Sequence, residues 1–517
     1  MTDLLGHLAL GFGVVFQVVD LKLNVFGALL TIPIPLNIVL CLIGALVGTL
    51  IGVLPGIGPL ATIAMLLPIT FGLPPVGALI MLAGIYYGAM YGGSTTAILV
   101  NIPGEAASVV TTLDGFQMAK QGRAGAALAI AAIGSFFAGC VATVVVAALG
   151  APLTRLALMF GPAEYFSLMV LGLVFAVVLA SGSIVKALAM ILLGLLLSMV
   201  GSDLETGQAR MSFDIPELAD GIGFIVVAMG VFGFGEILRN LEIPEHRDVL
   251  KTKLTGLMPT MADLKASAPA IGRGTLLGSI LGILPGGGTI ISAFASYTLE
   301  KKFAREPQRF GKGAIEGVAG PESANNAASQ TSFIPLLTLG IPPNAVMALM
   351  VGAMTIHGIV PGPQVMTKQP ELFWGLIASM WVGNLMLIII NLPLVGVWVK
   401  LLQVPYRHLY PAIIVFCCIG VYSLNNSPGD VVMTAAFGLL GYWFIKHDFE
   451  PAPMLLGFVL GPLMEENLRR AMLIARGDPT TFLTRPISAG LIAVSVLLLV
   501  LAVLPMIRKS REVVFTE

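Results

Sequence analysis

Apolar segments long enough to cross a lipid bilayer recur from one end of this chain to the other, separated by short polar or Gly-Pro-rich stretches. A helix needs about 20 apolar residues to span the hydrocarbon core. The pattern therefore predicts a helical membrane protein that begins with an amphipathic or membrane helix. It predicts single crossings near residues 76–98, 126–150, 165–181, 184–200 and 222–238, and further membrane segments at 372–398, 409–426, 430–446, 452–464 and 486–507.

Two other apolar segments are interrupted by the same glycine-proline motif. The copies are Gly52-Val-Leu-Pro-Gly-Ile-Gly58 and Gly282-Ile-Leu-Pro-Gly-Gly-Gly288. A second matched pair follows them, Asn101-Ile-Pro-Gly-Glu105 in the first half and Gly340-Ile-Pro-Pro-Asn344 in the second. We therefore interpret each half as a copy of one ancestral unit. Helices broken by Gly and Pro expose backbone N–H and C=O groups at membrane depth, which is typical of substrate sites in secondary transporters.

The helix after each motif extends this likeness. Residues 86–96 align without gaps with residues 325–335, and both runs lead into an Ile-Pro pair. The second copy is too polar for a helix that faces lipid, because amides and carboxylates are costly at membrane depth. It must face protein, water or a ligand. Its polar residues are Glu316, Glu322, Ser323, Asn325, Asn326, Ser329, Gln330 and Thr331.

The second motif lies between two basic connections, which the positive-inside rule places in the cytoplasm. The intervening segment, residues 274–299, must leave and return on that side. Its roughly 26 residues suffice for one tilted span or for two arms of about 15 to 20 Å. We therefore predict a re-entrant hairpin whose tip reaches the middle of the bilayer. The basic residues are Arg239, Arg247, Lys251, Lys253, Lys265 and Arg273 before it, and Lys301, Lys302, Arg305, Arg309 and Lys312 after it.

Counting crossings back from this cytoplasmic region predicts the orientation of the first motif. The acidic stretch at residues 201–220 falls outside, and Lys120 and Arg123 fall inside, as the positive-inside rule requires. An odd number of crossings separates the two hairpins, so the first, residues 36–73, should open to the opposite face. The repeats are therefore predicted to be inverted, an arrangement that supports alternating access to one central site.

Composition supports the membrane assignment and excludes other classes. Hydrophobic residues form 57% of the chain and charged residues 11%, far from the proportions of soluble domains. Lys plus Arg and Asp plus Glu number 28 each, so no basic surface for nucleic acid is expected. Residues 1–20 lack the basic start and the cleavage site of a signal peptide. Neither metal-binding nor disulfide spacing is found among Cys41, Cys140, Cys417 and Cys418.

Six runs are unusual enough to indicate a family. They are Leu54-Pro-Gly-Ile-Gly-Pro59, Ala83-Gly-Ile-Tyr-Tyr-Gly-Ala-Met-Tyr-Gly-Gly-Ser-Thr-Thr96, Asn101-Ile-Pro-Gly-Glu-Ala-Ala-Ser108, Asp114-Gly-Phe, Lys120-Gln-Gly-Arg-Ala-Gly125 and Gly320-Pro-Glu-Ser-Ala-Asn-Asn-Ala327. Together they resemble the large membrane subunit of the tripartite tricarboxylate transporters, the TctA family. The resemblance implies an uptake system of the bacterial inner membrane. In such a system a periplasmic solute-binding protein, TctC-like, delivers a carboxylate to a large and a small, TctB-like, membrane subunit.

The expected function is therefore the translocating subunit of a binding-protein-dependent importer of tricarboxylates or other small carboxylates. A Na⁺ or H⁺ gradient would drive it, with no cofactor beyond that co-transported ion, and the chain has no Gly-x-x-x-x-Gly-Lys-Ser/Thr phosphate loop. The alternative is a self-sufficient secondary transporter of another organic anion. An enzyme is not expected, because the membrane segments offer only an isolated His357 and Glu322 in place of paired catalytic groups.

The predicted fold is an all-α polytopic membrane protein of about 10 to 12 membrane helices, with two inverted repeats that each contain a re-entrant helical hairpin, working as an elevator-like transporter. The expected organisation is an N-terminal helix at 1–35, repeat 1 at 36–240 with its tip at 54–59, a cytoplasmic connection at 241–272, repeat 2 at 273–470 with its tip at 284–289, and a C-terminal membrane helix with a cytoplasmic tail at 471–517.

A carboxylate at membrane depth needs N–H and hydroxyl donors, which Gly-rich helix N-termini and Ser, Thr and Asn side chains supply. A sodium ion needs oxygen ligands. Neither motif contains Lys or Arg, so binding would rest on dipoles and a co-bound cation. The expected substrate-binding residues are Pro55, Gly56, Gly58, Ser94, Thr95, Thr96, Asn101, Pro285, Gly286, Gly287, Gly288, Thr289, Asn325, Asn326 and Asn344, and the ion-coupling candidates are Glu322, Ser329 and Gln330.

These assignments have structural alternatives. Residues 94–96 could pack closely between helices, and Asn325 and Asn326 could form interhelical hydrogen bonds. Glu322 is either a coupling group or a buried carboxylate satisfied by backbone donors. Glu105 is expected to cap a helix end rather than to touch substrate.

Overall fold

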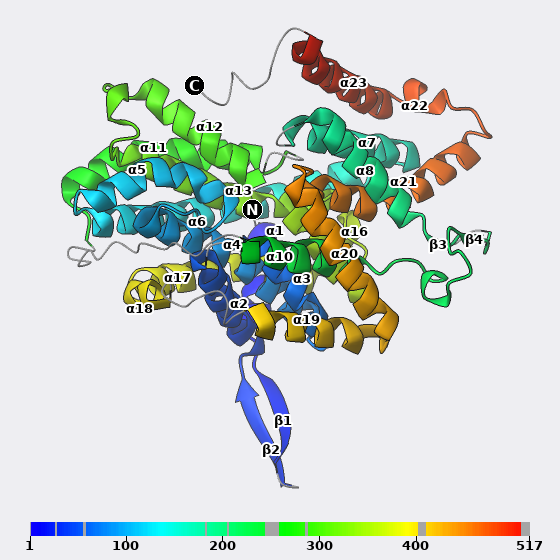
Figure 1. Ribbon diagram of the computed structural model, residues 1–517, viewed down its shortest axis with the longest axis horizontal. Coiled ribbons are helices and arrows are strands. Elements are labelled where there is room, and N and C mark those ends of the chain that lie inside the picture. The colour runs from blue at the N-terminus through cyan, green and yellow to red at the C-terminus, as the bar shows by residue number, and fades with distance from the viewer. Residues whose placement is uncertain are drawn as a thin grey trace.

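The computed structural model is built almost entirely from helices, with two short β-hairpins (Figure 1). It describes residues 2–25, 28–54, 58–180, 183–203, 206–242, 258–284, 288–401 and 410–507. Within these residues, 6 helical segments are long and apolar enough to cross a membrane, which confirms the prediction of a polytopic membrane protein. They are α2 (Leu36–Val53), α4 (Pro75–Val100), α6 (Ala124–Ala157), the segment Phe224–Glu242, α17 (Pro370–Asn391) and α20 (Pro428–Lys446).

Shorter helices complete the molecule, and each predicted membrane segment coincides with one or more helices. The segment at 224–242 consists of α9 (Phe224–Ala228), a π-helical turn η3 (Met229–Phe234) and α10 (Gly235–Glu242). The remaining elements are α1 (Thr2–Val15), α3 (Gly58–Thr70), η1 (Ala106–Ser108), α5 (Val109–Lys120), α7 (Pro162–Leu179), α8 (Ile184–Ser198), η2 (Pro216–Leu218), α11 (Met261–Leu281), α12 (Gly288–Phe303), η4 (Pro307–Arg309), α13 (Glu316–Thr331), α14 (Phe333–Leu339), α15 (Ala345–Ile356), α16 (Pro363–Lys368), α18 (Val395–Leu401), α19 (Tyr410–Asn425), α21 (Pro451–Ile474), α22 (Thr481–Thr484) and α23 (Pro486–Ile507), with strands β1 (Val19–Val25), β2 (Ala28–Ile34), β3 (Gly201–Ser202) and β4 (Ala209–Arg210).

Each Gly-Pro motif lies between two consecutive helices, α2 and α3 in the first half and α11 and α12 in the second. The tips themselves, residues 55–57 and 285–287, lie outside the described residues. The first described residue after each tip has a positive φ, 48° at Gly58 and 46° at Gly288. Glycine adopts this conformation without the steric cost of a Cβ, so both second arms begin with the same backbone requirement.

The first arm of the second hairpin is longer than the sequence indicated. Helix α11 has 21 residues and begins at Met261 rather than near 274, so it extends about 31 Å at 1.5 Å per residue. A capping box explains this start. Thr260 Oγ1 accepts a hydrogen bond from the Asp263 N–H at 3.1 Å, and Asp263 Oδ2 accepts one from the Thr260 N–H at 3.1 Å. These two bonds satisfy helix N–H groups that would otherwise lack partners.

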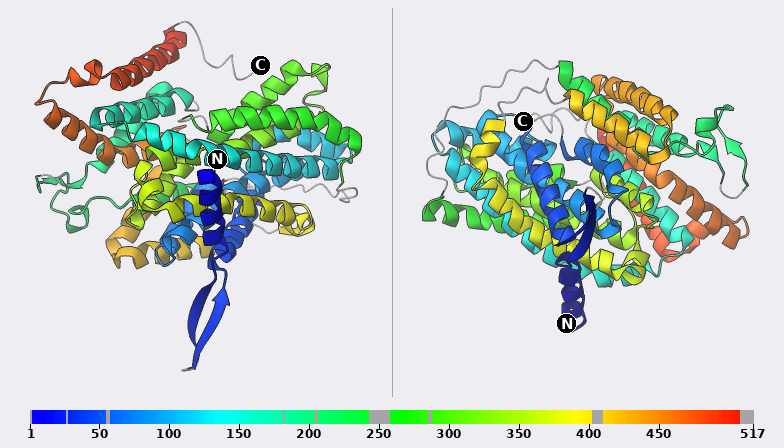
Figure 2. Two further views of the ribbon diagram at one scale, coloured as in Figure 1. Left: turned by 180° about the vertical axis from the view of Figure 1, so that it is seen from behind. Right: turned by 90° about the horizontal axis from the view of Figure 1, so that it is seen from below.

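The expected N-terminal helix ends earlier than predicted. Helix α1 stops at Val15, and strands β1 and β2 then form an antiparallel hairpin that projects from the helical body (Figure 2). The chain alternates here between apolar residues and Asp20, Lys22 and Asn24. That period of two favours a strand over a helix, and the prediction for residues 1–35 missed it.

Three glycines at successive turns of α2 bring this helix directly against α4. A Cβ at any of them would overlap a main-chain carbonyl oxygen of α4. Small residues allow two membrane helices to approach at backbone distance, where dispersion and weak Cα–H···O contacts accumulate. The facing pairs are Gly44 with Met81, Gly48 with Ile85, and Gly52 with Ala89.

Three glycines, again four residues apart, bring the backbone of α11 against that of α13. The glycines match those of α2 when the two Gly-Pro motifs are aligned. Their partners match those on α4 when residues 86–96 are aligned with residues 325–335. The facing pairs are Gly274 with Gly320, Gly278 with Ala324, and Gly282 with Ala328.

The Ile-Pro segments also match in backbone geometry. The helix before each segment ends at a residue in the left-handed region, Asn101 with φ of 59° and Gly340 with φ of 75°. The helix after each segment is capped by the last residue of the motif. Glu105 accepts a hydrogen bond from the Ala107 N–H, and Asn344 accepts one from the Met347 N–H.

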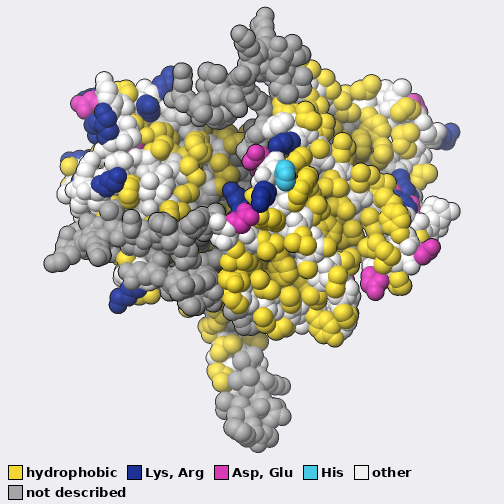
Figure 3. Space-filling view, viewed as in Figure 1, with side chains coloured by type: hydrophobic (Ala, Val, Ile, Leu, Met, Phe, Trp, Pro, Cys, Tyr) yellow, Lys and Arg dark blue, Asp and Glu magenta, His cyan; other side chains and the backbone are white. Residues whose placement is uncertain are grey.

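Helices from distant parts of the sequence pack together around this core. Helix α8 packs on α21, α7 packs on α23, and η3 and α10 pack on α20 (Figure 1). The space-filling view shows a broad apolar face (Figure 3), to which α19 and α20 contribute the exposed residues Val415, Ile419, Val432, Leu439 and Trp443. An exposed apolar surface of this kind is suited to lipid or to a membrane partner.

We expect Gly278→Ala to lower the unfolding free energy by about 1 to 3 kcal/mol, because the new Cβ would overlap the carbonyl oxygen of Ala324. The thermal unfolding midpoint of the detergent-purified protein measures this effect. Gly272→Ala is the matched control on α11, since its Cβ would meet nothing within 4 Å. Equal midpoints for the two variants would contradict backbone contact between α11 and α13.

Candidate functional site

Helix α13 carries a run of polar side chains that are almost completely buried. Helices α4, α5, α6, α11 and α12 and the turn η1 pack around it. The predicted polar helix therefore faces protein and not lipid. Its buried polar residues are Glu322, Ser323, Asn325, Asn326, Ser329, Gln330 and Thr331, none more than 1% exposed.

Glu322 is held by two hydroxyl groups from the first half of the chain. Its Oε2 lies 2.5 Å from Ser94 Oγ on α4, and its Oε1 accepts a hydrogen bond from Thr111 Oγ1 on α5. The structure thus brings together Ser94, an expected substrate residue, and Glu322, an expected coupling residue. The alternative in which backbone donors satisfy Glu322 is not observed, because both contacts come from side chains.

Two contacts cross between the halves in a reciprocal way. Asn325 Nδ2 donates to Glu105 Oε1 at 3.1 Å, and Asn344 Nδ2 donates to Tyr86 Oη at 3.4 Å. In the repeat alignment Glu105 corresponds to Asn344, and Tyr86 corresponds to Asn325. The capping residue of each half therefore contacts the helix of the other half. Glu105 also accepts from the Ala107 N–H at 2.8 Å, so it is a helix cap as expected.

Asn326 connects α13 to α6. Its Nδ2 donates to Ser135 Oγ at 2.7 Å and to the main-chain oxygen of Glu322 at 3.0 Å. The main-chain carbonyl of Glu322 can only accept, so it fixes which way the amide of Asn326 points. Several buried amide atoms then find no hydrogen-bond partner among the described residues. They are Asn325 Oδ1, Asn326 Oδ1, Gln330 Oε1 and Gln330 Nε2.

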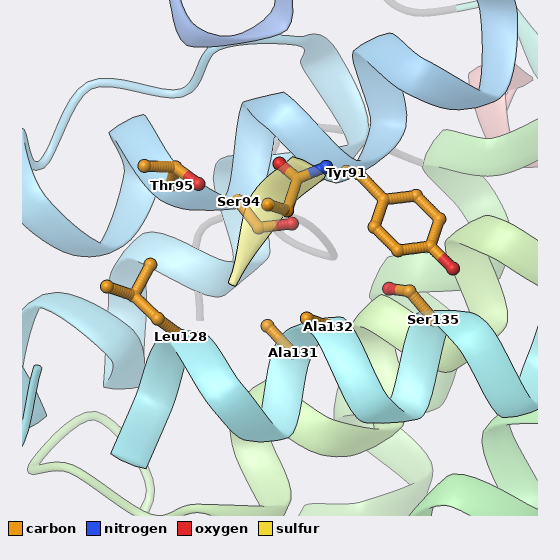
Figure 4. A pocket seen from close by; sticks show the side chains of 8 residues that line it. Tyr91, Ser94, Thr95, Leu128, Ala131, Ala132 and Ser135 are labelled. Atoms are coloured by element: carbon orange, nitrogen blue, oxygen red, sulfur yellow. The ribbon is translucent and has the colours of Figure 1, made fainter. Parts of the chain in front are cut away.

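A small pocket with a cavity volume of about 10 Å³, room for about one water molecule, lies next to this cluster. Figure 4 shows side chains of α4 and α6 facing one another across it. Ser94 and Thr95 contribute hydroxyls, and the α6 wall is mostly small and apolar. The lining residues are Tyr91, Ser94, Thr95, Leu128, Ala131, Ala132, Ser135 and Asn391.

The remaining expected site residues lie in three places. Thr96 Oγ1 donates to the Val53 carbonyl at 2.7 Å, which ties α4 to the end of α2. Thr289 is buried in the first turn of α12, next to Gly288, whose Cβ position would lie 3.8 Å from the Cβ of Asn344. Asn101 is exposed at the end of α4. The tip residues Pro55, Gly56, Pro285, Gly286 and Gly287 lie outside the described residues.

Ser329 has a local role, since its hydroxyl donates to the main-chain oxygen of Asn326 within α13. In the part of the chain that the structure describes, no Lys or Arg forms an ion pair with Glu105 or Glu322. The same residues contain no cluster of three His, Cys, Asp or Glu side chains that could hold a metal ion. The polar cluster therefore has two carboxylates without a paired cationic side chain.

The sequence analysis missed four residues of this region. Thr111 binds Glu322 and Ser135 binds Asn326, while Asn384 and Asn391 extend from α17 to Tyr91 and Thr49. Asn384 and Asn391 are seven residues apart in an apolar span, which places them on one helix face. This seven-residue spacing is the sequence feature that could have identified both residues. Thr111 and Ser135 are single hydroxyls that no sequence pattern distinguishes.

These features define a polytopic helical membrane protein with a buried polar cluster between its two halves. Residues 38–456 match the tripartite tricarboxylate transporter TctA family, and the chain belongs to that family. The resemblance seen in the sequence is thereby confirmed. TctA is a family of transporters and not of enzymes.

Two proteins of Agrobacterium vitis are similar to this chain. One, an uncharacterized 52.8 kDa protein in the TAR-I ttuC' 3' region, is 57% identical over 517 residues, which is 100% of both chains. The other, an uncharacterized protein in the TAR-II ttuC' 3' region, is 62% identical over 240 residues, 46% of this chain and 99% of that protein. No solved structure matches the chain.

We expect Thr96→Val to reduce the unfolding free energy by about 1 kcal/mol, because Val has the shape of Thr but cannot donate to the Val53 carbonyl. Thr96→Ser keeps the hydroxyl and is the control. Thermal unfolding of both variants in detergent checks the prediction. A midpoint for Thr96→Val equal to that of Thr96→Ser would show that this hydroxyl does not hold α2 against α4.

Proposed function

We propose that this TctA-family chain is the translocating subunit of an importer of tricarboxylates or other small carboxylates in the bacterial inner membrane. A periplasmic solute-binding protein would deliver the substrate, a small membrane subunit would complete the complex, and an ion gradient would drive uptake. The observation that carries this proposal is the cluster on α13. It is polar, buried between the halves, and contains amide atoms without partners among the described residues. Unsatisfied polar atoms are costly in a membrane interior unless a ligand or water binds them.

The residues suit a carboxylate with no cationic side chain nearby. Ser94 and Thr95 point hydroxyls toward the pocket (Figure 4). Helices α3 and α12 begin directly after the two tips, so their unpaired N–H groups and the positive ends of their dipoles favour an anion. A co-transported cation would neutralise the substrate charge, which keeps the loaded site able to cross the low-dielectric region.

The reciprocal contacts support an arrangement of two repeats about a two-fold axis. A pair in which residue i of one unit contacts j of the other, while j contacts i, is the signature of two-fold symmetry. Glu105 with Asn325 and Asn344 with Tyr86 form such a pair. With an axis in the membrane plane, the repeats would be inverted, and an elevator-like or rocking motion of one core would expose the site to alternate faces.

Side-chain contacts at the helix ends support the inverted orientation. Arg123 pairs with Asp263 at 2.5 Å, and Gln121 Nε2 donates to the Lys312 carbonyl at 2.8 Å. The open end of the second hairpin therefore lies on the same side of the molecule as the basic residues at the start of α6. Asp203 of the acidic segment instead pairs with Arg469 at the far end of α21. These contacts agree with an acidic outer face and a basic cytoplasmic face.

Membrane vesicles that contain this chain, the small subunit and the binding protein should accumulate labelled tri- or dicarboxylates down an imposed Na⁺ or H⁺ gradient. Uptake should stop when the binding protein is omitted, because delivery is its role in such a system. A panel of labelled mono-, di- and tricarboxylates measures both the activity and the substrate class. Equal uptake without the binding protein would favour a self-sufficient anion transporter instead.

The topology predicts opposite accessibility of two positions. In a background with Cys41, Cys140, Cys417 and Cys418 replaced by Ser, cysteines introduced as Ser202→Cys and Gln308→Cys should react with an impermeant thiol reagent from opposite faces of the membrane. The crossing at 222–238 separates the two positions, and the second hairpin leaves and returns on one face, so this result is required. Labelling of both from one face would exclude inverted repeats, and the unsubstituted cysteine-free protein controls for background reaction.

A further inference from the structure

We infer that Glu322 binds and releases the coupling proton, and that its carboxylic acid form is the one held between Ser94 and Thr111 in this structure. This inference rests on the proposed ion-coupled transport and identifies its ion. Glu322 is 1% exposed, and its carboxyl contacts two neutral hydroxyls from the other half of the chain.

Counting hydrogens at Ser94 points to the acid form. A hydroxyl has one hydrogen to donate and can also accept. Ser94 Oγ lies 3.3 Å from the Met90 carbonyl oxygen and 2.5 Å from Glu322 Oε2, and both of these atoms are acceptors when the carboxyl is ionised. Ser94 could then donate its hydrogen to only one of them. If Glu322 Oε2 carries a proton, it donates to Ser94, Ser94 donates to Met90, and Thr111 donates to Oε1.

Among the described residues, no Lys or Arg pairs with Glu322 to balance an ionised carboxylate. On the elements packed against α13, Arg273 of α11 pairs with Glu300 of α12 at 2.5 Å, and Asp114 of α5 accepts from Tyr297 and from the Gly313 and Ala314 N–H groups. An unpaired carboxylate in a dry interior is strongly unfavourable. The other titratable side chains there are Tyr86, Tyr87 and Tyr91 on α4, Glu105 before η1, Cys140 on α6, and the residues nearer the helix ends or exposed, Lys120, Arg155, Asp263, Lys265, Lys301 and Lys302.

Glu105 offers a contrast within the same cluster. Both partners of its carboxyl, the Ala107 N–H and Asn325 Nδ2, are donors. It also stands at the N-terminal end of η1, where the peptide dipoles favour negative charge. The described partners of the Glu105 carboxyl are thus an N–H and an amide, whereas those of Glu322 are hydroxyls, which can accept as well as donate.

The position of Ser94 links the proton to the substrate. Ser94 lines the pocket and also contacts Glu322. An ionised Glu322 would repel an anion bound at Ser94, whereas the neutral acid would not. Protonation, –COO⁻ + H⁺ → –COOH at Glu322, therefore comes before entry of the carboxylate substrate. Release to the cytoplasm reverses both parts, and no other reactant is needed.

Infrared spectroscopy of the full-length protein in lipid tests the proton site directly, because a protonated carboxyl has a C=O stretch distinct from that of a carboxylate. At neutral pH in Na⁺-free buffer, wild type should show a buried carboxylic acid band. Glu322→Gln should lose that band, and it should still fold because the Gln amide can donate to Ser94 and accept from Thr111. Glu105→Gln is the control and should keep the band.

Two results would overturn the inference. One is a wild-type spectrum without the band, and the other is a band that Glu322→Gln leaves at full intensity. Adding NaCl in place of choline chloride should leave the band unchanged. Its loss on addition of Na⁺ would instead indicate a sodium ion bound to the Glu322 carboxylate.

Transport by the same variants separates this inference from the proposed function. With a carboxylate that wild type accumulates, Glu322→Gln should lose accumulation driven by a pH gradient but keep exchange of labelled for unlabelled substrate. Retained pH-driven accumulation would refute the role of Glu322 and leave carboxylate import intact. If wild type imports no carboxylate, the proposed function fails, and the infrared band still reports whether Glu322 holds a proton.

Discussion

The hydrocarbon interior of a bilayer offers no hydrogen-bond partner, so a helix as polar as α13 can lie at membrane depth only if protein surrounds it. The fold meets this constraint by close packing. Glycines on α11 place its backbone against α13, and α4, α5 and α6 cover the other sides. The same spacing of glycines places α2 against α4. Much of the core therefore consists of helices that surround α13 and keep its polar side chains away from lipid.

Enclosure also determines the chemistry of the cluster. Water could solvate a charge or an unpaired amide at the surface, but here each group depends on a small number of fixed neighbours. Glu322 has two hydroxyls, Asn326 has Ser135, and Asn325 has Glu105. Atoms without such neighbours among the described residues, as on Gln330, are the least satisfied polar groups of the cluster.

The contacts between the halves show how two segments with matching motifs form one polar cluster. Each Ile-Pro segment breaks a helix and places a capping residue, Glu105 or Asn344, against the opposite half. The two contacts differ in chemistry. A carboxylate faces an amide in one, and an amide faces a phenol in the other. The proposed two-fold arrangement is therefore chemically asymmetric, with the polar cluster on α13 and aromatic residues at the matching positions of α4.

The sequence alone determined the features that depend on local pattern. The membrane spans, the positions of both interrupted hairpins and the polar character of α13 follow from periodicity, Gly-Pro motifs and charge, because these act within a few turns of chain. The tertiary structure decided which side chains meet. Ser94 and Glu322 are separated by 228 residues, and α8 and α21 pack together from opposite halves. Such contacts depend on how whole helices pack, which no local window of sequence encodes.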